Sequence, residues 1–201
     1  MKKLLFFISV ILLFSCQNNS PKGVEAIDLG LPSGTKWANM NVGATTPEDY
    51  GGYYAWGETE ERPYFDEVAY FFHLTAHCLD YGTDISGTEY DVAHVKWGGR
   101  WQMPTSEQIE ELIHYCNTIF TEFNGVKGCK LISRINGNSI FLPSAGFRVE
   151  DKLSEVGDIG GYWSASLYTE REAHGLGFKW EVVSCINKRY IGASVRPCTI
   201  H

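Results

Sequence analysis

Six cysteines give this sequence its most reactive side chains, because a thiol can be acylated, oxidised to a disulfide or bound to a metal. The first follows an apolar run over residues 4–14 that begins after Lys2 and Lys3, which is the pattern of a signal peptide. A signal peptide implies export to a compartment that permits disulfides. The other five are Cys78, Cys116, Cys129, Cys185 and Cys198. Five thiols cannot all pair within one chain, so two bridges and one free thiol, or fewer bridges, are predicted.

The residues before Cys16 predict how its thiol is used. Leu13 lies three positions before it and Ser15 directly before it, which resembles the lipobox of bacterial lipoproteins. Cleavage there removes residues 1–15 as the signal peptide, and residues 16–26 become an acylated N-terminus, carrying palmitate, and a tether. The apolar run is shorter than the roughly 20 residues that a membrane-spanning helix needs. An ordinary secretory signal that is cleaved nearby is the alternative.

Metal and catalytic chemistry have weaker support. His73 and His77 are four residues apart and adjoin Cys78, so zinc is an alternative use of that thiol, but no CxxC pair accompanies them. Residues 31–34 lack the glycine spacing of a nucleophile elbow, and the many carboxylates of residues 58–67 do not define an acid and base pair. We therefore predict no enzyme, no catalytic residue, no metal site and no cofactor.

The elements that would position these residues are short. Glycine and proline turn signals separate runs of β-branched, aromatic and small residues, which predicts an α+β class with antiparallel strands. Strands are expected over residues 36–42, 138–142, 162–167, 173–180 and 191–196.

Two helices are also expected. Thr105 with Gln108 makes a capping box, and apolar residues at positions 109, 112, 113 and 116 follow with helical spacing. A shorter helix is predicted to start at Thr46, with Pro47 in its first position and Gly51 near its end.

Length and charge restrict the function further. The 201 residues carry a formal net charge of −7, which becomes −9 when the two lysines of the signal peptide are removed. An acidic surface without a basic cluster argues against a nucleic-acid partner. The membrane is instead the predicted partner, through the lipid on Cys16.

Short motifs follow one another in a fixed order from residue 27 to residue 198. They are DLGLPSGTKWA (28–38), NVGA (41–44), PEDYG (47–51), YAWGE (54–58), AHV (93–95), WGG (97–99), WQMPT (101–105), NGNSIFLP (136–143), AG (145–146), YWSAS (162–166) and GASVRP (192–197). In this order they resemble the Fibrobacter succinogenes major paralogous domain family. Residues 59–88 and 118–123 match less closely.

The resemblance implies a C-type-lectin-like architecture: a single domain over residues 27–201 with small twisted antiparallel sheets, long loops and one or two helices. Cys78 and Cys116 fall where members of the family often carry cysteine, so the resemblance also implies that these two pair. Arg196 we interpret as a strand-end ion pair. Enzymes that generate formylglycine share the architecture and use two cysteines, for which Cys185 and Cys198 are superficial candidates, but the flanking residues do not match and this alternative is disfavoured.

The family implies no settled activity. We expect a ligand-binding or adhesion module in the cell envelope, anchored at the outer membrane, with a glycan or protein ligand. A structural envelope lipoprotein without a small ligand is the alternative. The sequence lacks the carboxylate-Pro-amide triplet and the Trp-Asn-Asp strand of calcium-dependent lectins, so sugar binding is predicted to be calcium-independent and carried by aromatic rings.

The aromatic residues fall into two predicted groups. Those within the matched motifs are expected to fill the core: Trp37, Trp97, Trp101 and Trp163. Those in the looser segments are better candidates for sugar stacking, although they do not yet define a site: Tyr64, Tyr70, Tyr81, Tyr90, Tyr168 and Trp180.

Overall fold

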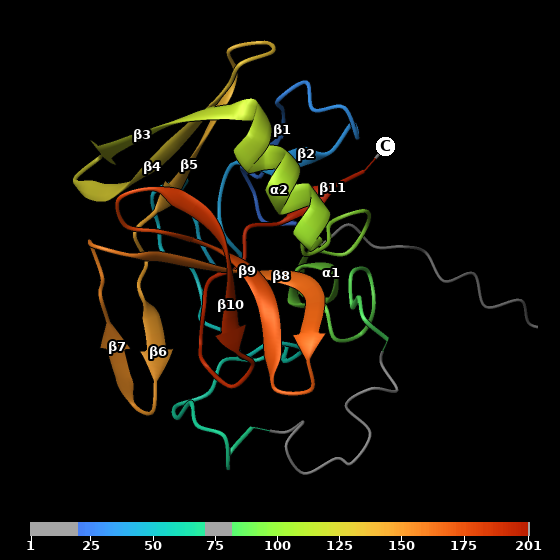
Figure 1. Ribbon diagram of the computed structural model, residues 1–201, viewed down its shortest axis with the longest axis vertical. Helices are drawn as coiled ribbons and strands as arrows, with labels where there is room; N and C mark the ends of the chain where they lie inside the picture. Colours follow the sequence, from blue (N-terminus) through green and yellow to red (C-terminus); the bar gives the residue numbers. More distant parts are fainter. Residues whose placement is uncertain (1–19, 71–81, 201) are drawn as a thin grey trace, which may run out of the picture.

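The computed structural model describes residues 20–70 and 82–200. Over these residues the chain forms small antiparallel sheets and two helices, which confirms the α+β class (Figure 1). The helices are α1 (Val92–Trp97) and α2 (Ser106–Tyr115). The strands are β1 (Ala26–Asp28), β2 (Lys36–Ala38), β3 (Cys116–Phe123), β4 (Val126–Ser133), β5 (Ser139–Pro143), β6 (Phe147–Val149), β7 (Lys152–Ser154), β8 (Gly160–Thr169), β9 (Glu172–Phe178), β10 (Val182–Lys188) and β11 (Cys198–Thr199).

The strands of the described chain are grouped into four sheets, ordered β1-β2-β11, β10-β9-β8, β3-β4-β5 and β6-β7. In Figure 1 the β3–β5 sheet lies above the β8–β10 sheet, and the β6–β7 hairpin lies at the lower left, to the left of the β8–β10 sheet. Helix α2 lies against the β8–β10 sheet. No helix within residues 20–70 and 82–200 has the length and apolar character needed to cross a membrane.

Helix α2 forms as the sequence predicts. The Thr105 hydroxyl accepts a hydrogen bond from the Gln108 backbone N–H, and the Gln108 side chain accepts one from the Thr105 N–H, so the capping box is complete. Ile109 and Leu112 are buried on the side that faces the core. The helix ends at Tyr115, and Cys116 begins β3 directly.

Helix α1 was not predicted, because its six residues are too few to display helical periodicity. The carboxylate of Asp91 caps it by accepting hydrogen bonds from the Ala93 and His94 N–H groups, at 2.9 and 3.1 Å. The chain leaves the helix through Gly98, whose φ of 66° is readily adopted only by glycine.

The helix predicted from Thr46 is wrong. Residues 45–48 form bends and a turn. The carboxylate of Asp49 accepts hydrogen bonds from the N–H groups of Thr45 and Thr46 and from the Thr45 hydroxyl, at 2.6–3.1 Å. This side chain satisfies the backbone groups locally, so a helix does not propagate after Pro47.

The strand predictions are partly confirmed. Segments 138–142, 162–167 and 173–180 correspond to β5, β8 and β9. The predicted strand 36–42 is only the three-residue β2, and 191–196 forms isolated bridges at positions 192, 193 and 194 instead of a strand. The hairpin of β3 and β4 was missed, because seven of the eight residues of β3 are exposed and show no alternation of apolar and polar residues.

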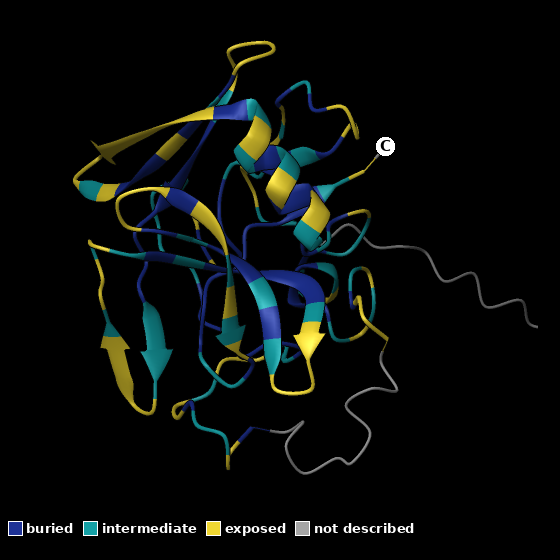
Figure 2. Ribbon diagram, in the orientation of Figure 1, coloured by how far each residue is buried: buried dark blue, intermediate teal, exposed yellow. Residues whose placement is uncertain are grey.

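The four matched-motif tryptophans are buried, as predicted, with 8% or less of each side chain exposed. Two large hydrophobic clusters lie on the two faces of the β8–β10 sheet. Most residues of β8 itself are buried (Figure 2). One cluster contains Tyr162 and Phe178 with residues of α2. The other contains Trp163, Trp97 and Ala173. The sheet is therefore the layer that joins both halves of the core.

The interpretation of Arg196 as an ion pair is wrong. Its guanidinium is 1% exposed and donates to Asn41 Oδ1 at 2.8 Å, to the Ala38 carbonyl at 3.0 Å and to the Phe141 carbonyl at 2.9 Å. Among the described residues no carboxylate forms an ion pair with it. Burial lowers the pKa of Arg196 to about 10, so it stays charged at neutral pH. This one side chain joins β2 to β5 through neutral acceptors.

Candidate ligand-binding site around Trp180

Several predicted residues lie outside the described residues: Cys16, His73, His77, Cys78 and Tyr81. Lipidation, the zinc alternative and the Cys78–Cys116 pair therefore stay predictions. No group of three or more His, Cys, Asp or Glu side chains within 20–70 and 82–200 is arranged to hold a metal.

The described cysteines lie in separate environments. Cys116 is buried where α2 meets β3 and forms no disulfide with another cysteine of the described residues, and burial raises the pKa of its thiol to about 11. Cys198 in β11 donates to the side-chain oxygen of Gln108 at 3.4 Å, whereas Cys185 in β10 accepts from Asn187 Nδ2 at 3.2 Å. The last two belong to different sheets and have different partners, and burial raises the pKa of both thiols.

The aromatic candidates separate clearly by exposure. Tyr70 is buried, and its hydroxyl donates to the Trp56 carbonyl, so it is unsuited to stacking with a ligand. Tyr64 is 42% exposed, Tyr168 53% and Trp180 84%. A tryptophan so exposed leaves a large apolar surface in water, and such surfaces often mark binding sites.

Trp180 lies in the connection between β9 and β10, beside Lys179. The Lys179 ammonium is 5.9 Å from the centroid of the Trp180 ring and 3.5 Å from a carboxylate oxygen of Glu155. Glu155 thus pairs with Lys179, and Lys179 lies over one face of the indole. Most of the indole surface stays open to solvent.

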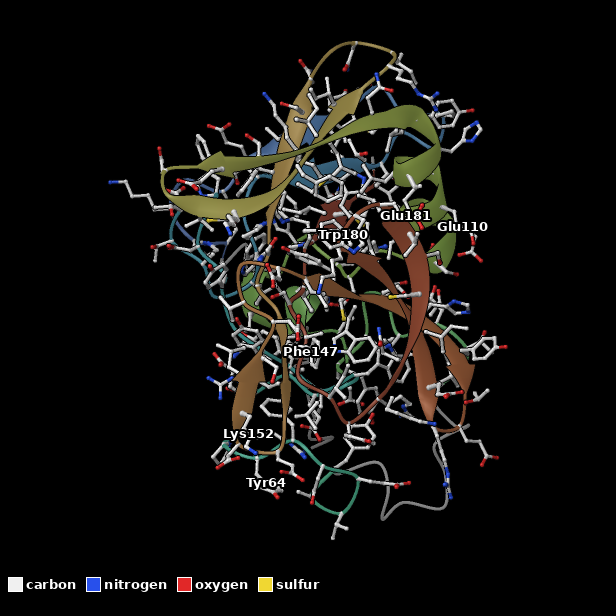
Figure 3. The ribbon with its side chains drawn as sticks, turned by 60° about the vertical axis from the view of Figure 1, so that its left-hand side comes forward. Tyr64, Glu110, Phe147, Lys152, Trp180 and Glu181 are labelled. Atoms are coloured by element: carbon white, nitrogen blue, oxygen red, sulfur yellow. The ribbon has the colours of Figure 1, made fainter. Side chains whose placement is uncertain are left out.

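Two shallow grooves meet at Trp180. Groove A has a volume of about 420 Å³ and is lined by Phe147, Ile159, Gly160, Gly161, Gly177, Phe178, Lys179, Trp180, Glu181, Val183, Cys185, Asn187, Ile191 and Ala193. Groove B has a volume of about 370 Å³ and is lined by Phe120, Thr121, Glu122, Lys127, Gly128, Ser144, Gly157, Asp158, Lys179 and Trp180. In Figure 3 Trp180 lies between the β3–β4 hairpin above and Phe147 below.

Glycines of two paired strands form the floor of groove A. Gly161 of β8 is opposite Gly177 of β9, so this part of the sheet presents backbone instead of side chains. A Cβ added at Gly161 would meet only the Gly146 carbonyl, at 3.5 Å, which is an ordinary contact. The space over Gly161 is therefore open to a ligand.

A third groove, of about 450 Å³, lies between β1 and the β3–β5 sheet. Its two phenylalanine rings, Phe123 and Phe141, pack against each other with centroids 5.5 Å apart. No aromatic ring there is as open to solvent as Trp180, and the grooves beside Trp180 are the better candidate site.

Trp180 was among the aromatic candidates from the sequence, but Lys179, Phe147 and the glycine floor were missed. One signal was present: Gly160 and Gly161 are adjacent, and glycines within a strand often mark a place where a ligand or another backbone approaches closely. Phe147 gave no such signal, because its position depends on pairing between β6 and β7.

Acrylamide quenching of fluorescence should detect Trp180 alone. All six tryptophans lie in described parts of the chain, and the other five are at most 8% exposed. We expect Trp180→Phe to remove nearly all of the emission that acrylamide quenches, leaving the blue-shifted emission of the buried rings. Strong quenching that persists in this variant would contradict the exposure of Trp180.

Comparison of the chain with family models, with curated proteins and with solved structures finds no match. The fold and the geometry around Trp180 are therefore the basis for a functional assignment.

Proposed function

We propose that this protein is a lipid-anchored envelope lipoprotein whose C-type-lectin-like domain binds carbohydrate through Trp180. The observation that carries the proposal is the 84% exposure of this indole at the junction of two grooves. Small antiparallel sheets joined by long connections support the lectin-like assignment.

Stacking is the chemistry that this arrangement favours. The flat apolar face of a pyranose can cover an indole ring, and aromatic stacking contributes about 0.5–1.5 kcal/mol beyond burial of area. Lys179 lies over one face of the ring, so the sugar would occupy the other. The polar side chain of Asn187 in groove A is within the same site and suits sugar hydroxyls.

Affinity electrophoresis of the mature domain tests the proposal. The native gels would contain xylan, mixed-linkage β-glucan or galactomannan, with polygalacturonate and chondroitin sulfate as anionic comparators. We expect at least one polysaccharide to retard the domain and Trp180→Ala to abolish the retardation. Migration unaffected by all five polymers would contradict the proposal and favour the structural alternative.

Binding is also expected to be independent of calcium. A bound calcium ion needs about six to eight oxygen ligands, and the sequence lacks the lectin motifs that provide them. Retardation in the same gels should therefore be unchanged by excess chelator. Loss of retardation with chelator, restored by added calcium, would show that an ion takes part.

The anchor is tested separately, with Cys16→Ala. Without the thiol no lipid can be attached, so the variant should leave the detergent-soluble membrane fraction and fail to incorporate labelled palmitate. The next cysteine along the chain is Cys78, so no neighbouring thiol can substitute. A variant that stays membrane-bound and labelled would contradict lipidation at Cys16.

A further inference from the structure

The two grooves form one continuous track. Groove A and groove B share Lys179 and Trp180, so a ligand on the indole can extend into either. Groove A runs over β8–β10, and groove B runs beside the β3–β4 hairpin. Trp180 therefore lies in the middle of the track. A pocket for the end of a sugar chain would instead be closed on one side of the stacking ring.

The charges along the track do not favour an anionic ligand. Lys179 is paired with Glu155, and Lys127 is directly opposite Glu122 in the β3–β4 ladder. The remaining charged side chains that line the track are acidic, Asp158 and Glu181. Sulfated or uronic chains would meet no basic cluster and would approach uncompensated carboxylates.

From these two observations we infer that the ligand is an internal segment of an uncharged, linear polysaccharide, with one sugar stacked on Trp180 and neighbouring sugars in both grooves. The inference rests on the proposed function and adds the class of ligand and its direction across the surface. The combined track is comparable in size to pockets that enclose ligands of several rings, of roughly 300–1,000 Å³.

The dependence of affinity on chain length tests this inference. The probes are uncharged linear β-linked oligosaccharides from disaccharide to hexasaccharide, prepared from whichever neutral polymer retards the domain. Affinity should rise by about tenfold or more along the series, because longer chains fill both grooves. The reducing and non-reducing ends should not be required, so chains blocked at either end should bind equally.

Two variants test the contribution of each groove to affinity independently. Gly161→Leu places a side chain on the open floor of groove A, where the backbone has space for it and φ is not positive. Glu122→Tyr obstructs groove B from an exposed position of β3, because Glu122 shares its face of the strand with Phe120. Each variant should leave the disaccharide affinity within about twofold of that of the original protein, and should reduce the rise in affinity from disaccharide to hexasaccharide. Gly161→Ala is the matched control and should retain the full rise in affinity.

The outcomes distinguish the two proposals. If affinity is the same for all chain lengths, or both obstructing variants keep the full gain, the inference is wrong while sugar binding at Trp180 stands. If anionic polymers bind better than neutral ones, the inference is also wrong. If no polymer binds, the proposed function itself fails.

Discussion

Replacing Arg196 with methionine is expected to lower the free energy of unfolding by about 3–5 kcal/mol. Methionine is of similar length but cannot donate hydrogen bonds. The substitution removes the guanidinium N–H groups that donate to Asn41 Oδ1 and to the carbonyls of Ala38 and Phe141, in a site closed to water. Each buried acceptor left unpaired costs about 1–3 kcal/mol, and the three costs are not fully additive. Denaturant unfolding of the purified protein measures the change.

The matched control is Arg171→Met. Arg171 is 73% exposed in its side chain and pairs with Glu67 at 3.6 Å. A solvent-exposed ion pair contributes at most about 1 kcal/mol, so this variant should unfold close to the original midpoint. If Arg196→Met lost less than the control, the role of Arg196 in joining β2 to β5 would be refuted.

Trp180→Ala is expected to weaken binding of the retarding polysaccharide by about 30-fold or more, the equivalent of about 2 kcal/mol at a residue that dominates a binding site. The variant loses both the stacking face and the apolar area that the sugar covers. Its stability should change by less than about 0.5 kcal/mol, because the indole is 84% exposed. Calorimetric titration gives the affinity, and unfolding gives the stability.

Tyr168→Ala provides the control for this experiment. Tyr168 is also exposed, at 53%, but its ring contacts His174 and does not line either groove. Removing it should leave the affinity unchanged. Equal losses of affinity in Trp180→Ala and Tyr168→Ala would mean that Trp180 is not the main contact. Trp180→Phe should retain part of the affinity, because a smaller aromatic ring remains.

Local signals in the sequence predicted the parts of the fold that depend on neighbouring residues. The capping box of Thr105 and Gln108 fixes α2, and runs of β-branched and aromatic residues mark β5, β8 and β9. These elements form because residues close in the sequence supply the partners for their backbone hydrogen bonds. Where a side chain competes for those groups, as Asp49 does after Thr45, the same reasoning predicted a helix that does not form.

Features that depend on distant contacts were not predictable. Arg196 was interpreted as a strand-end ion pair, but its partners are neutral acceptors 55, 155 and 158 positions away in the sequence. The β3–β4 hairpin was missed for a different reason: β3 is exposed along nearly its whole length and lacks the apolar pattern of a strand, but the Asn124-Gly125 turn, with both residues at positive φ, is a local hairpin signal that the interpretation overlooked. Only the three-dimensional structure reveals the partners of Arg196.

The candidate site shows the same contrast between features that local sequence predicts and features that depend on the whole fold. Trp180 could be selected from the sequence because it lies outside the matched motifs, but Tyr70 had the same standing and is buried. Exposure depends on the whole fold, and so do the grooves, whose linings come from β3, β4, β6, β8, β9 and β10. A single sequence cannot bring these segments together.

The central claim is that the ligand covers Trp180, and acrylamide quenching in the presence of a saturating amount of the retarding polysaccharide tests it most directly. Trp180 is the exposed tryptophan, so its emission reports on its own surroundings. The prediction is that bound polysaccharide shields this emission and lowers the quenching constant to nearly that of Trp180→Phe. An unchanged quenching constant, with calorimetry showing the polysaccharide bound, would place the ligand elsewhere and contradict the account.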